Sequence, residues 1–97
     1  MSYQIFWSEE AIANLEQILD YLSKKWTERE VRNFKARLVE QIEIIAKFPF
    51  GFPASAQIPR LRKAVLTKHT SIIYEVSGQN IYLAYIFDNR QNSEKVK

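Results

Sequence analysis

The chain has 97 residues, a net charge of +3 and a hydrophobic fraction of 46%, which predict one domain over residues 1–97 with a packed core. Cysteine is absent, which excludes disulfides, thiolate zinc sites and a cysteine nucleophile. No signal-peptide pattern and no apolar run long enough to span a bilayer is visible, so we expect a cytoplasmic protein that does not enter a membrane.

The first half of the chain predicts one strand and two helices. Residues 3–7 form an apolar and aromatic run that is typical of a strand. Ser8 can cap the helix that follows, whose apolar side chains recur at helical spacing and which ends in two lysines. Thr27 and Glu30 match a capping box that begins a second helix, and Pro49 ends it. The short connection between the helices predicts an antiparallel helical hairpin.

The second half predicts a loop followed by three strands. Residues 50–59 have the composition of a loop, and residues 61–66 form the first strand. Residues 70–76 and 81–87 form the next two strands, joined as a hairpin across residues 77–80. The whole order predicts an α+β fold (β-α-α-β-β-β) in which the helical hairpin packs on one face of a mostly antiparallel sheet. The other face of the sheet should then stay partly open.

Charge is distributed unevenly between the two halves. Residues 1–43 contain six Lys or Arg and eight Asp or Glu, a net charge of −2, whereas residues 44–97 contain eight and three, a net charge of +5. A basic second half suggests an anionic partner, either nucleic acid or an acidic protein segment. The alternative is a solvated basic face that binds nothing.

Metal and cofactor chemistry finds little support in the sequence. One histidine, no cysteine and scattered carboxylates offer no ligand cluster, so we expect neither a metal nor another cofactor. A serine-histidine-acid triad built on His69 is rejected, because nothing fixes its geometry. The only glycines, Gly51 and Gly78, do not form a phosphate-binding loop.

The basic residues around the first strand of the second half are the main candidates for a site. Strict alternation predicts that Arg60 and Arg62 share a face, with Lys68 and His69 just beyond the strand end. An arginine cluster beside tyrosines can bind phosphates while the rings stack on bases, and it suits an acidic protein partner equally well. The alternative for tyrosines such as Tyr74 is packing in the core, with the hydroxyl at the edge.

Short segments along nearly the whole chain match one family pattern in the correct order. They are residues 3–8 with Ala11; Leu15, Ile18 and Tyr21; Phe34, Leu38 and Ile42; and residues 48–51, 61–63, 72–76 and 86–92. In this ordered set the chain resembles the RelE/ParE superfamily of toxins from type II toxin–antitoxin systems. The resemblance implies a compact sheet under a helical hairpin, in a heteromeric complex with a cognate antitoxin whose extended tail wraps the toxin.

One branch of this superfamily, the RelE-like branch, cleaves messenger RNA in the ribosomal A site without a metal. Residue by residue, Arg62 and Lys68 or His69 match its basic catalytic positions on the sheet, and Arg90 matches the basic residue after the last strand. Two features depart from this pattern. No aromatic residue follows in residues 91–97, and no arginine precedes the strand that begins near residue 70.

The ParE-like branch poisons DNA gyrase and lacks that nuclease set. Residues 61–63, 73–76 and 89–91 are more similar to this branch, so the resemblance favours gyrase as the target, with the ribosome and its message as the alternative. A member that binds only its antitoxin is a third possibility. The residues expected to bind antitoxin or target are Arg60, Arg62, Lys63, Tyr74 and Arg90.

Overall fold

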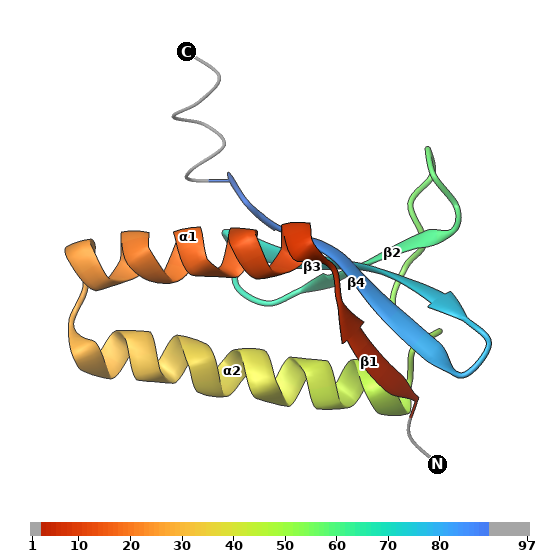
Figure 1. The fold of residues 1–97 in the computed structure, drawn as a ribbon, viewed down its shortest axis with the longest axis horizontal. Coiled ribbons are helices and arrows are strands. Elements are labelled where there is room, and N and C mark those ends of the chain that lie inside the picture. The colour runs from red at the N-terminus through yellow and green to blue at the C-terminus, as the bar shows by residue number, and fades with distance from the viewer. Residues whose placement is uncertain (1–2, 90–97) are drawn as a thin grey trace.

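The computed structural model describes residues 3–89 and contains two helices and one four-stranded sheet (Figure 1). In chain order the elements are β1 (Gln4–Trp7), α1 (Glu9–Lys25), α2 (Glu28–Lys47), β2 (Leu61–Val65), β3 (Thr70–Ser77) and β4 (Asn80–Asp88). This order confirms the predicted α+β fold. Within residues 3–89, neither helix is long and apolar enough to cross a membrane.

The sheet brings the first and last strands of the chain together. Its strand order is β1-β4-β3-β2, with β1 parallel to β4 and the other two pairs antiparallel. The sheet is therefore mostly antiparallel, as predicted. A two-residue turn joins β3 to β4, and its first residue, Gly78, has a φ of 61°, a conformation that favours glycine.

Both helices begin at the predicted capping residues. The Ser8 hydroxyl accepts a hydrogen bond from the Ala11 amide at 2.9 Å and donates one to the Ala84 carbonyl of β4 at 2.6 Å. At α2, the Glu30 amide donates to the Thr27 hydroxyl, and the Thr27 amide donates to the Glu30 carboxylate. Ser8 thus both caps α1 and ties the start of that helix to the sheet.

The helical hairpin covers one face of the sheet, and the core lies between these two layers (Figure 1). Ile18 of α1, Ile45 of α2 and Ile72, Ile81 and Leu83 of the sheet are fully buried there. The periodic apolar stripes of both helices meet the apolar side chains of every second strand position. No helix or strand of residues 3–89 covers the opposite face of the sheet, although residues 53–58 of the loop border it beside β2.

An irregularity in the β3–β4 pairing determines which side chains reach the open face. Tyr74 pairs with Leu83 and the preceding Ile73 pairs with Tyr85, so Ala84 is an extra residue in β4. This β-bulge shifts the alternation by one position. As a result Tyr82 and Tyr85, three residues apart, both lie on the open face.

We expect the Ser8→Ala variant to lose about 1–2 kcal/mol of unfolding free energy, because the change removes a helix cap and leaves the Ala84 carbonyl without its donor. Ser23→Ala is the matched control, since that exposed hydroxyl only donates to a carbonyl within its own helix. Urea denaturation followed by circular dichroism measures both changes. Equal midpoints for the two variants would contradict the proposed role of Ser8.

Candidate functional site

Arg60 and Arg62 point in different directions. Arg60 precedes β2, and its Nε lies 3.6 Å from Oε1 of Glu75. Glu75 is the cross-strand partner of Leu61, whereas Arg62 is the partner of Tyr74, so the two arginines serve opposite faces of the sheet. The prediction that they share a face is wrong, because strand alternation does not extend to a residue in the preceding turn.

Arg62 lies on the helix-covered face and is bound by the loop that follows α2. Its Nη1 donates a hydrogen bond to the Phe52 carbonyl at 2.6 Å, and its guanidinium carbon lies 5.1 Å from the centre of the Phe50 ring. Ala54 of the same loop forms a backbone bridge with Arg62. The guanidinium therefore stabilises the loop in this structure, and any further role in binding stays a prediction.

Tyr74 is fully buried, as the core-packing interpretation of the tyrosines anticipates. Its hydroxyl donates a hydrogen bond of 2.5 Å to the Pro49 carbonyl, and its ring meets Phe52 edge-on. Burial raises the pKa of Tyr74 to about 12, an effect that the nearby Arg62 guanidinium opposes. The hydroxyl therefore stays protonated, and a partner has no access to this side chain.

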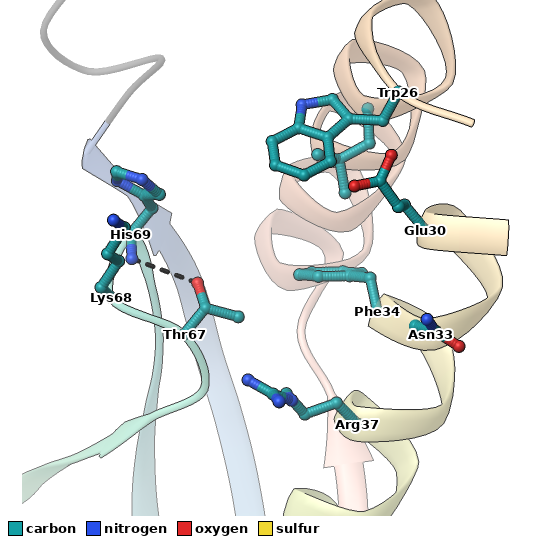
Figure 2. A pocket seen from close by; sticks show the side chains of 9 residues that line it. Trp26, Glu30, Asn33, Phe34, Arg37, Thr67, Lys68 and His69 are labelled. Atoms are coloured by element: carbon teal, nitrogen blue, oxygen red, sulfur yellow. Dashed lines mark hydrogen bonds between the residues drawn. The ribbon is translucent and has the colours of Figure 1, made fainter. Parts of the chain in front are cut away.

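Lys68 and His69 lie in the turn between β2 and β3, away from Arg62. His69 Nδ1 lies 3.2 Å from the amide oxygen of Asn89. Both residues border a hollow of about 320 Å³ whose other wall is α2 (Figure 2). Arg90, the remaining predicted site residue, lies outside the described residues.

The open face of the sheet is largely apolar and aromatic, whereas the sequence predicted an arginine cluster beside tyrosines. Phe6 and Tyr82 stack with ring centres 5.4 Å apart, and both are about two-fifths exposed. Val65 and Phe87 are also exposed on this face. Lys63 is the predicted site residue that lies here with its side chain exposed. Strand alternation predicted that Lys63 and Arg62 lie on opposite faces, but it did not decide which face is open, and the bulge and the pairing of β1 with β4 had no local signal.

The sequence matches a family model over residues 5–93, nearly its whole length. The family is described as the ParE toxin of the type II toxin–antitoxin system parDE. This chain belongs to the ParE toxin family. The match confirms the predicted relationship to the RelE/ParE superfamily, with the ParE branch closer. No curated protein sequence matches the chain.

Solved structures share the fold of this ParE family member. A chain of the chromosomal ParDE system from P. aeruginosa superposes with a TM-score of 0.75 at 20% identity, covering 90% of this chain and 96% of that one. In the RelBE2 toxin–antitoxin complex from Mycobacterium tuberculosis the TM-score is 0.63 at 13% identity, with coverages of 91% and 99%. A conserved hypothetical protein from Helicobacter pylori gives 0.59 at 9%, with coverages of 91% and 96%. At these identities the likeness establishes the fold alone.

We expect Tyr74→Phe to lose about 1–3 kcal/mol of unfolding free energy, because it leaves the buried Pro49 carbonyl without its hydrogen bond. Tyr82→Phe is the control, since its hydroxyl is exposed. Urea denaturation at neutral pH measures both variants.

The same hydroxyl predicts a pH dependence. The pKa of Tyr74 is about 12 in the folded protein against about 10 in an unfolded chain. The protonated hydroxyl therefore contributes fully to the unfolding free energy below pH 10, and this contribution is lost as the pH rises toward 12. The stability difference between wild type and Tyr74→Phe should therefore shrink over this range. A stability difference that stays constant from pH 9 to about 12 would count against the raised pKa of Tyr74.

Proposed function

We propose that this ParE family chain is a growth-inhibiting toxin whose target is DNA gyrase and which a cognate antitoxin neutralises. The observation that carries the proposal is the family match over residues 5–93. The structural likeness to a chain of the P. aeruginosa ParDE system is consistent with it. On this proposal the protein acts by binding, and it needs no catalytic group of its own.

The arrangement of the basic residues supports binding over RNA cleavage. Cleavage by 2′-hydroxyl attack needs cationic and proton-transferring groups around one phosphate. The Arg62 guanidinium is held by the Phe52 carbonyl, and about 10 Å of extended strand separates Arg62 from Val65, the last residue of β2, with Lys68 and His69 further along. Within residues 3–89 these three side chains therefore do not surround a common point.

The open sheet face is the surface we propose for the antitoxin. Exposed apolar side chains that gather on one face of a protein mark interaction surfaces, and here they come from β1, β2 and β4. Lys63 lies on the same face with an exposed ammonium. A segment with apolar side chains and a carboxylate would complement both features.

Purified protein is expected to inhibit supercoiling by DNA gyrase and to stabilise the cleaved DNA–gyrase complex. Induction in cells without antitoxin should then cause DNA breaks while messenger RNA stays intact, and both are measured in the same culture. Unchanged supercoiling at high toxin excess would overturn the gyrase proposal. A-site cleavage of message that His69→Ala abolishes would establish the nuclease alternative.

The antitoxin surface is tested by comparing Val65→Glu with Val39→Glu. Each valine is 56% exposed, but Val65 lies on the open sheet face and Val39 on α2. We expect Val65→Glu to weaken binding to the antitoxin encoded by the adjacent reading frame by about tenfold or more. The new carboxylate would be buried in the interface and would repel an acidic partner. Val39→Glu should leave the affinity, measured by calorimetry, unchanged. Equal antitoxin affinities of the Val65→Glu and Val39→Glu variants would show that the open face is not part of the interface.

A further inference from the structure

A second surface lies apart from the open face, at the tip of the helical hairpin. The hollow between α2 and the β2–β3 turn has a volume of about 320 Å³. Its lining comprises Leu22, Trp26, Glu30, Asn33, Phe34, Arg37, Thr67, Lys68 and His69. Figure 2 shows Phe34 and Arg37 pointing from α2 toward the turn that carries Lys68 and His69.

The floor of this hollow is apolar and incompletely covered. Leu22 and Phe34 are buried and belong to the core, but Trp26 is 47% exposed although it is one of the largest apolar side chains of the protein. Trp26 is the C-cap residue of α1, so its backbone position is fixed by the hydrogen bond to Leu22. A half-exposed indole held on a rigid helix end is the type of residue that anchors protein interfaces.

The rim of the hollow carries unpaired positive charge on both walls. Arg37 projects from α2 and Lys68 from the β2–β3 turn, and neither side chain makes an ion pair or hydrogen bond with residues 3–89. The one carboxylate of the lining, Glu30, is engaged at Oε1 by the amide and hydroxyl of Thr27. The hollow is therefore apolar in its floor and net cationic at its rim.

We propose that this hollow binds an apolar side chain of the antitoxin that is flanked by carboxylates, as a second anchor beside the open sheet face. The inference rests on the proposed function, because it takes the antitoxin as the occupant. The apolar residue fills the space over Trp26 and Phe34, and the carboxylates meet Arg37 and Lys68.

A nucleic acid strand fits this hollow less well than an acidic peptide. The first turns of α2 beside the hollow carry Glu28 and Glu30 as well as Arg29 and Arg32, so the repeating phosphates of a strand laid along them would meet carboxylates as well as cations. A peptide needs carboxylates only beside the cations of the rim. The complementary charges thus favour a protein segment.

The first experiment monitors Trp26 in the complex. In a Trp7→Phe background Trp26 is the single tryptophan, and saturation with the antitoxin encoded by the adjacent reading frame should shift its emission to the blue and reduce quenching by acrylamide. Unchanged quenching in a saturated complex would overturn the proposal. Protection of Trp26 by a short single-stranded oligonucleotide, with none by antitoxin, would overturn it in favour of nucleic acid.

The second experiment keeps both tryptophans and measures antitoxin affinity. Arg37→Ala and Lys68→Ala should each weaken binding about tenfold, whereas Arg29→Ala, on the same helix but outside the hollow, should bind like the wild type. Circular dichroism confirms that each variant is folded. An Arg37→Ala affinity equal to that of Arg29→Ala would overturn the proposal.

These results separate the two proposals. Failure to inhibit gyrase together with protection of Trp26 would reject the target and keep the hollow as an antitoxin site. Antitoxin binding that leaves Trp26 exposed would reject the hollow and keep the toxin–antitoxin pairing. No binding of any kind by the adjacent gene product would overturn the hollow as an antitoxin site and the antitoxin part of the proposed function, while the supercoiling assay tests the gyrase target by itself.

Discussion

The packing of the helical hairpin on one face of the sheet is the constraint on which the remaining features depend. It buries Ile72, Ile81 and Leu83 and commits every second strand position to the core. The positions between them must then face away from the helices, whatever their chemistry. This is why aromatic and apolar side chains such as Tyr82 and Val65 remain exposed, and why a partner that covers them would gain hydrophobic stabilisation.

Basic and aromatic side chains that look like ligand-binding residues in the sequence can instead donate hydrogen bonds to the backbone carbonyls of a loop. The loop after α2 has carbonyl groups without helix or sheet partners, and such groups need donors when they are buried. Tyr74 donates to the Pro49 carbonyl and Arg62 to the Phe52 carbonyl. Both donors lie on the covered face, so the same loop closes one end of the core. A basic or aromatic residue on the covered side of the sheet thus contributes to the stability of the fold rather than to an exposed binding surface.

The open face and the hollow lie on either side of the β2–β3 turn, so one flexible partner can reach both. In our proposal an antitoxin chain passes from Lys63 and Val65 on the sheet around the turn to the rim at Lys68. Binding at one surface would raise the effective concentration of the partner at the other. Two contacts of modest strength can then give a tight complex, and loss of either one weakens it without abolishing it.

The sequence by itself determined the elements and their order, because the signals are local: the caps at Ser8 and Thr27, the turn at Gly78 and the periodicity of apolar residues. Alternation also separated Lys63 from Arg62 along the strand, but the sequence did not decide which of the two faces the helices. Only the tertiary structure decided the parallel pairing of β1 with β4, the bulge at Ala84, the divergence of the two arginines and the hollow beside Trp26. Each of these depends on contacts between residues far apart in the chain, and no residue type or spacing near the site encodes them.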